Sequence, residues 1–142
     1  MDLSAFLAEN IAPEENVKFA ASPRIKDPVT GKPVLWEIKA IFGTEDEELR
    51  KSCTKRVPVP GKRNQYQRET DINQYLGKLA VACTVFPNLN DKSLQDNHCV
   101  MGAENLLKKM LSAGEYATYL EEVQKVCGFD VPLQEEVDTA KN

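Results

Sequence analysis

The strongest pattern in the chain is an apolar repeat at steps of three and four over residues 69–89. This spacing places the apolar side chains on one face of an α-helix. Within 79–86 only Thr84 is polar, so this half is expected to be apolar all round and to lie at the centre of the domain. The repeating positions are Ile72, Tyr75, Leu76, Leu79, Ala80, Cys83 and Phe86.

Signals for helix ends frame this segment. Thr70 or Asp71 can cap the first turn, because a short side-chain oxygen accepts a free backbone N–H there. Pro87 disfavours helical backbone at the residue before it, so the helix is expected to stop at Phe86.

Two earlier stretches alternate between apolar and polar positions, which is the period of a β-strand. The segment between them, KDPVTGKP, has the prolines and glycine of a turn. Together they predict a β-hairpin at about 17–42, whose apolar face the helices must cover because a lone hairpin is marginally stable in water. The apolar positions are Val17, Phe19, Ala21 and Ile25, then Trp36, Ile38, Ala40 and Phe42.

Further helices are predicted from residues typical of helix ends. A helix over 103–111 follows Gly102, and Gly128 is expected to end a last helix that runs to about Cys127. Phe129 is expected to fold back onto that helix. The expected caps are Ser4, Thr44 with Glu47, Asn90 or Asp91, and Ser112 with Glu115.

These elements predict an α+β fold, a predominantly α-helical single domain with an N-terminal β-hairpin packed on the helices. The hairpin occupies about 17–42 and the helical body about 44–128, within one domain over residues 1–130. Residues 131–142 are polar and are expected to form a flexible tail.

Composition indicates an ordinary globular protein. The chain has 142 residues and a net charge of −4, with neither a long apolar run nor the basic start of a secretory signal. We therefore expect no membrane contact and a location in the cytoplasm. The four cysteines, at 53, 83, 99 and 127, are far apart and are interpreted as small, reduced, apolar residues.

Charge is unevenly distributed. Residues 50–68 include seven basic residues and no acidic one, so the rest of the chain has a net charge of about −11. Pro58 and Pro60 exclude a helix there and favour an extended path. Residues 57–68 have no apolar periodicity and little area to bury, so we expect them to be poorly ordered in the protein alone. Three interpretations remain open for this segment: a solvated linker, a docking loop for an acidic or helical protein partner, or a contact to nucleic-acid phosphates.

Catalytic chemistry has little support in the sequence. His98 is the only histidine, and its neighbour Cys99 does not give the paired spacing of a zinc site. Neither a P-loop nor a dinucleotide-binding glycine pattern occurs. We therefore expect no enzyme activity, no metal and no cofactor.

The chain resembles the XkdN-like phage tail assembly chaperone family of Gram-positive phages and defective prophages, from about Leu3 to Asp130. The resemblance rests on the segments LSAFLAEN, VLWEIKAI, CTKRVPVPGKRNQYQRETD, YLGKLAVACTVFPNLND, VMGAENLLKKML and GEYATYLEEVQKVCGFD. Where the family pattern suggests an aromatic residue and a glycine before VMG, this chain has His98 and Cys99.

The resemblance implies a non-enzymatic assembly factor that holds the tape measure protein, and possibly the tail tube protein, in the bacterial host cytoplasm. The alternatives are a nucleic-acid-associated phage regulator that uses segment 50–68, or a minor structural tail component. Nucleic acid is not the expected partner, and a homo-oligomer remains open. The candidate partner-binding residues are Arg56, Lys62, Arg63, Arg68, Tyr116 and Tyr119.

Overall fold

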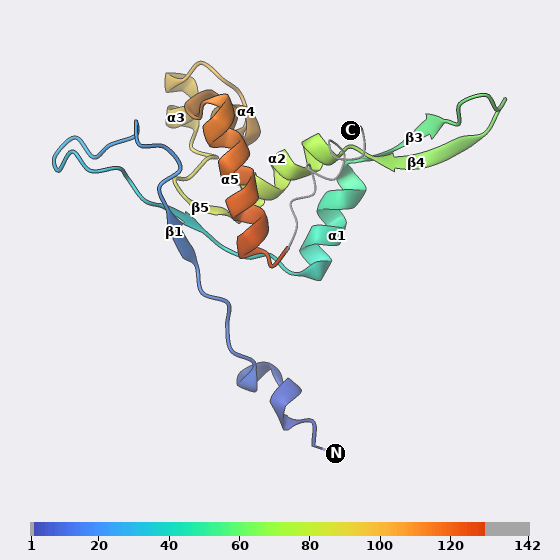
Figure 1. The fold of residues 1–142 in the computed structure, drawn as a ribbon, viewed down its shortest axis with the longest axis horizontal. Coiled ribbons are helices and arrows are strands. Elements are labelled where there is room, and N and C mark those ends of the chain that lie inside the picture. The colour runs from blue at the N-terminus through green and yellow to red at the C-terminus, as the bar shows by residue number, and fades with distance from the viewer. Residues whose placement is uncertain (1, 130–142) are drawn as a thin grey trace.

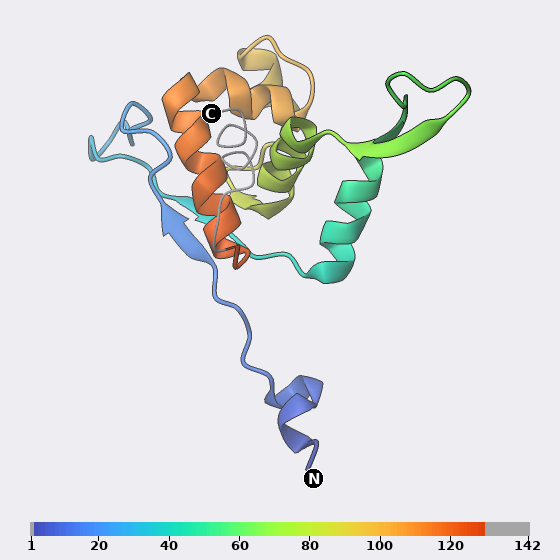
Figure 2. The same cartoon turned by 45° about the vertical axis from the view of Figure 1, so that its right-hand side comes forward.

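The computed structural model describes residues 2–129, and the predicted flexible tail at 131–142 lies outside them. The described chain has an α+β fold in which α-helices pack around one small sheet (Figure 1). A second, two-stranded ribbon and the N-terminal segment project from this body in different directions (Figures 1 and 2). The predicted fold class is therefore confirmed. The helices are α1 (Gly43–Ser52), α2 (Ile72–Cys83), α3 (Lys92–Asn97), α4 (Ala103–Met110) and α5 (Ala113–Val126).

The sheet of the body has three antiparallel strands in the order β1-β2-β5. The pairing of Val17 with Ile38 and of Phe19 with Trp36 confirms the predicted N-terminal hairpin, although its strands are only three residues long. The third strand, β5, was not predicted. The strands of this sheet are β1 (Val17–Phe19), β2 (Trp36–Ile38) and β5 (Thr84–Phe86).

Helix α2 lies at the centre of the core, as its apolar repeat predicts. Asp71 is its N-cap and accepts a hydrogen bond from the backbone N–H of Gln74. The predicted end at Phe86 is wrong, because the helix stops at Cys83 and the chain continues as β5. Thr84 makes this change of direction: its backbone is extended, and its hydroxyl donates to the carbonyl of Ala80.

The core joins the sheet to α2, α4 and α5. Trp36 meets Tyr119 of α5 edge to face, with ring centroids 5.1 Å apart, so the hairpin packs on the helices as predicted. The largest fully buried side chains are those of Trp36, Tyr75, Tyr119, Ile38, Leu76, Leu79, Leu106 and Leu107.

The helix-end predictions have mixed outcomes. Ser112 and Glu115 form the predicted capping box of α5, and Gly128 has the expected positive φ of +90°. The box at Thr44 is wrong, because α1 already begins at Gly43, after Phe42. Ser4 is not a cap either, since the N-terminal segment forms two short 3₁₀ helices, the first at Ser4–Phe6 and the second at Ala8–Asn10.

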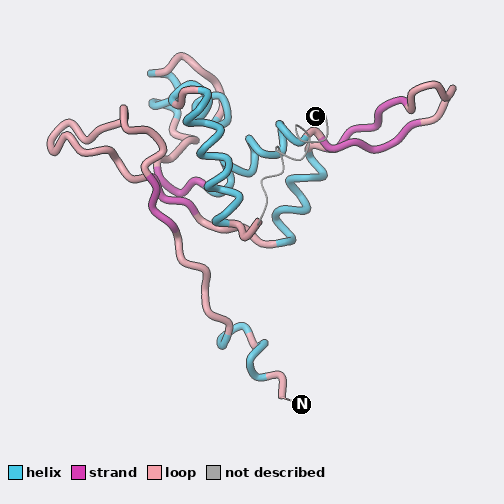
Figure 3. The backbone as a smooth tube through the Cα atoms, in the orientation of Figure 1, coloured by secondary structure: helices cyan, strands magenta, loops and turns pink. Residues whose placement is uncertain are grey.

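Segment 54–70 is the largest correction to the sequence analysis. The extended path holds, but the expected lack of order does not, because the segment pairs as an antiparallel ribbon of β3 (Thr54–Pro58) and β4 (Tyr66–Thr70). Figure 3 shows this ribbon leaving the body between α1 and α2. We call residues 54–70 the basic hairpin.

In the described part of the chain, no helix has the length and apolar character needed to cross a membrane.

Candidate partner-binding hairpin

The local sequence explains why the basic hairpin forms. Pro58 and Pro60 exclude a helix, and the turn beyond them uses positive φ at Gly61 (+76°) and Asn64 (+59°). The backbone N–H of Val59 donates to the carbonyl of Gln65 at 3.0 Å, which continues the pairing into the loop. The result is a regular ribbon with a short, exposed tip.

The basic hairpin joins the body where its two ends lie side by side. The Thr54 and Thr70 hydroxyls, which are cross-strand partners, are hydrogen-bonded at 2.9 Å. The backbone N–H of Asp71 donates to the carbonyl of Cys53 at 2.8 Å. These contacts hold the end of α1 beside the start of α2.

A polar cluster sets the angle between those two helices. Arg50 of α1 is bonded to Asp46 at 3.0 Å and lies over the ring of Tyr75, with 4.4 Å from guanidinium carbon to ring centroid. The Tyr75 hydroxyl also donates to Asp46. Burial and the Asp46 carboxylate raise the pKa of Tyr75, so the hydroxyl stays protonated and keeps this donor role.

One face of the hairpin concentrates positive charge. Arg56 and Arg68 lie directly opposite each other in the ladder, and the guanidinium of Arg56 sits 4.6 Å from the centroid of the Tyr66 ring. Like charges in that position weaken strand pairing, so the pair works against the stability of its own ribbon. An anionic group placed between the two arginines would remove that repulsion.

An open hollow of about 230 Å³ lies beside this face. Four basic side chains line this hollow: those of Lys51, Lys55, Arg56 and Arg68. Of these four, only the two arginines were candidate partner-binding residues from the sequence. Planar guanidinium groups match carboxylates and phosphates with paired hydrogen bonds. The arrangement therefore suits recognition of an anionic surface.

The other candidate residues lie elsewhere. Lys62 and Arg63 are exposed at the hairpin tip. Tyr116 is half-buried on α5, which lies away from the hairpin in both views of the fold (Figures 1 and 2). Tyr119 is fully buried, and its hydroxyl is 2.6 Å from that of Thr84, so it has no surface to offer a partner. Burial raises the pKa of Tyr119 to about 12.

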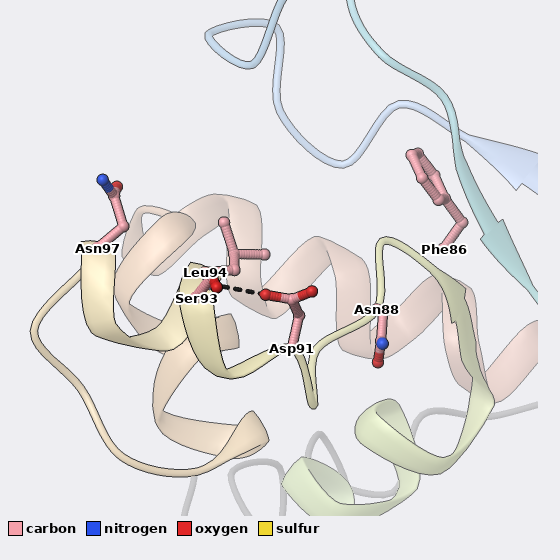
Figure 4. Close-up of a pocket in the computed structure, with 6 residues that line it drawn as sticks. All are labelled: Phe86, Asn88, Asp91, Ser93, Leu94 and Asn97. Carbon is pink, nitrogen blue, oxygen red and sulfur yellow. Dashed lines mark hydrogen bonds between the residues drawn. The ribbon is translucent and has the colours of Figure 1, made fainter.

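A second hollow, of about 500 Å³, lies beside β5 and α3 (Figure 4). The exposed ring of Phe86 stands on one side of it, and Asp91 on its floor already accepts the backbone N–H of Leu94 as the cap of α3. This surface was not predicted, because the apolar repeat places Phe86 inside a helix, whereas Phe86 ends β5. Its polar groups mainly serve the turns around it.

The His98–Cys99 turn is closed by the backbone. His98 is the C-cap of α3 and Cys99 takes a positive φ of 59°, with its N–H donating to the carbonyl of Asp96. Across residues 2–129, no three His, Cys, Asp or Glu side chains gather in a way that could hold a metal ion.

Fold and site together define a small α+β domain with a projecting basic hairpin. The chain belongs to a known family: it matches the phage XkdN-like tail assembly chaperone proteins over residues 3–141. This finding confirms the family resemblance.

Two proteins of Bacillus subtilis (strain 168) are similar to this chain over nearly its full length. The chain is 32% identical to the uncharacterized protein YqbN, over 99% of this chain and 93% of that protein. It is 27% identical to the phage-like element PBSX protein XkdN of the same organism, over 99% of this chain and 94% of that one. The crystal structure of YqbN superposes with a TM-score of 0.77 at 29% identity, covering 92% of this chain and 98% of the other.

Proposed function

We propose that this protein acts in the host cytoplasm as a non-enzymatic chaperone that binds the tape measure protein during tail assembly, and that the basic hairpin makes the first contact. Family membership supports the assembly role. The observation that supports the hairpin as the contact is the opposed pair Arg56 and Arg68, a charge arrangement that costs ribbon stability and favours an acidic partner.

The hairpin suits fast capture of such a partner. Its seven-residue loop and its strands are exposed almost throughout, and positive charge projects away from an otherwise acidic body. Long-range attraction of this kind raises the association rate more than the final affinity. A long helical client can then settle on the body itself.

The test is association kinetics with the tape measure protein of the same phage or prophage, at two salt concentrations. The variant Lys62→Ser/Arg63→Ser should associate more slowly, most clearly at low salt, and should keep the thermal stability of the wild type, because exposed charges contribute little to folding. Lys26→Ser/Lys32→Ser is the matched control, since it removes two exposed charges from the other long loop. An unchanged association rate in the hairpin variant at low salt would refute the hairpin contact.

The same positive charge favours a second candidate, a nucleic-acid-associated regulator. Phosphate contact predicts binding to random duplex DNA that weakens steeply as salt rises. Binding of DNA with that salt dependence, without capture of the tape measure protein on co-expression, would establish the regulator instead. Recovery of the chain from purified particles would point to a minor structural component.

A further inference from the structure

Two of the four cysteines meet at the C-terminal ends of α2 and α5, two helices of the core. Cys83 is the last residue of α2, and Cys127 is the C-cap of α5. Their sulfur atoms are 3.4 Å apart, although 44 positions separate them in the chain. A disulfide needs about 2.05 Å, so the two sulfurs must approach by roughly 1.4 Å.

Cys127 is the partner that can make this movement. Cys83 is fully buried within α2, whereas Cys127 is half-buried where α5 ends. The next residue, Gly128, turns the chain away from the helix axis with a positive φ, so Cys127 lies in the last turn of α5 with no further helical turn beyond it.

A small reagent has a route to the Cys127 sulfur. A hollow of about 160 Å³ lies beside it, against the start of α1. That volume is several times the roughly 30 Å³ that one water molecule occupies in the liquid. Hydrogen peroxide is only slightly larger than water, so it can enter this hollow. The remaining lining residues are Ile41, Phe42, Gly43, Asp46 and Phe129.

The two thiols differ in character because of their surroundings. A hydrogen bond from the Cys83 thiol and one from the backbone N–H of Ile41 lower the pKa of Cys127, against burial and the opposing charges of Asp46 and Glu45. The same hydrogen bond and burial raise the pKa of Cys83, with Lys39 acting weakly the other way. Cys127 is also the more exposed of the two sulfurs, and it is thus assigned as the nucleophile, with Cys83 as the protonated partner.

We propose that Cys83 and Cys127 are a modification site, at which a peroxide converts the two thiols into a reversible intramolecular disulfide. The Cys127 thiolate attacks one peroxide oxygen, the O–O bond breaks, and the released oxygen takes a proton and leaves as water or an alcohol. The Cys83 sulfur then attacks the resulting sulfenic acid, the S–O bond breaks, and water leaves with the Cys83 proton. The thiols are oxidised by two electrons and the peroxide is reduced by two.

The test is peptide mapping of the full chain after treatment with hydrogen peroxide, alkylation and trypsin digestion without reductant. Peptides 79–92 and 126–141 contain one cysteine each, Cys83 and Cys127. We expect them linked, at the summed mass less two hydrogens, and separated again by dithiothreitol.

Two variants sharpen the result. Cys99→Ser removes the exposed thiol and should still form the link, whereas Cys127→Ser should form none and leave Cys83 open to alkylation after denaturation. Far-UV dichroism of both variants checks that the fold is intact, and the wild-type map decides the matter even if one variant is unfolded. Alkylated Cys83 and Cys127 in wild-type protein whose Cys99 has been oxidised would overturn the proposal, as would Cys127 oxidised to sulfinic acid without the link.

Discussion

Glu115 joins parts of the chain that are far apart in sequence. Its carboxylate accepts from the Ser22 hydroxyl at 2.7 Å and from the backbone N–H of Ser112 at 2.9 Å, and it pairs with Arg24 at 2.6 Å. These bonds lower the pKa of Glu115 from 4.5 to about 2, and the bond to Arg24 makes the largest contribution. One side chain thus completes a helix cap and attaches the loop after β1 to α5.

This pKa shift predicts a particular dependence of stability on pH. Because the folded pKa lies below the unfolded one, the contribution of Glu115 is complete above about pH 4.5 and is lost as the pH falls towards about 2. Glu115→Gln should therefore be less stable than wild type at neutral pH. The difference in free energy of unfolding between the two proteins should become smaller as the pH falls from about 4.5 to about 2. Denaturant unfolding at a series of pH values measures it.

Glu121→Gln is the control, since it removes one carboxylate from the same helix. It should leave the acid dependence of unfolding as it is in wild type. A gap between wild type and Glu115→Gln that stays constant from neutral pH down to pH 2 would show that the carboxylate is not paired in solution.

Helix caps could be predicted from single residues where the backbone group that the side chain binds is close in sequence. Asp71, Asp91 and the Ser112–Glu115 box all cap helices as predicted, because each needs only a backbone N–H three positions away. Thr44 failed although its box pattern is equally good. Helix α1 begins at Gly43 with Phe42 in the N-cap position, so Thr44 already lies inside the first turn and no side chain caps this helix.

At the scale of elements, the positive charge of the basic hairpin weakens the pairing of its two strands. The ribbon packs little against the body, and its central cross-strand pair is repulsive. If the arginines are there to meet an acidic partner, then relieving the repulsion should strengthen the ribbon and weaken binding together.

Arg68→Glu tests this trade-off. It places a carboxylate opposite Arg56, and a favourable cross-strand pair contributes about 0.2–1 kcal/mol relative to a neutral one. We expect slower hydrogen exchange of the ribbon amides and, in the same variant, slower association with the tape measure protein. Gln67→Glu, on the other face opposite Val57, should change both less. Arg68→Glu with wild-type association would argue against a role for this face.

The two strand pairings that were missed both lack a decisive local pattern in the sequence. A short segment such as 84–86, in which two apolar residues follow Thr84, suits a helix or a strand equally, and only its pairing with β2 decides between them. The pairing of β3 with β4 was missed for a related reason, because both strands are polar and show no buried face. Family resemblance, in contrast, was readable from the order of segments alone.

On the scale of the whole molecule, stability depends on α2. Leu79→Ala removes a fully buried side chain from the helix that contacts both α4 and α5, and should lower the free energy of unfolding by about 2–5 kcal/mol. Denaturant unfolding followed by dichroism measures this loss.

Leu3→Ala is the same substitution on the projecting N-terminal segment, where the side chain is 64% exposed, and should have almost no effect on unfolding. A loss below about 0.5 kcal/mol for Leu79→Ala would place the core elsewhere.

The single attachment point of the basic hairpin also bears on how such chaperones can diverge. The ribbon enters and leaves the body between Cys53 and Asp71, whose backbones are hydrogen-bonded to each other. Closing a longer or shorter loop across a fixed base changes the entropy of folding only slowly with length. A ribbon of another length or sequence can therefore be accommodated at the same base without rebuilding the body, and if the ribbon contacts the client, such a change would alter client choice.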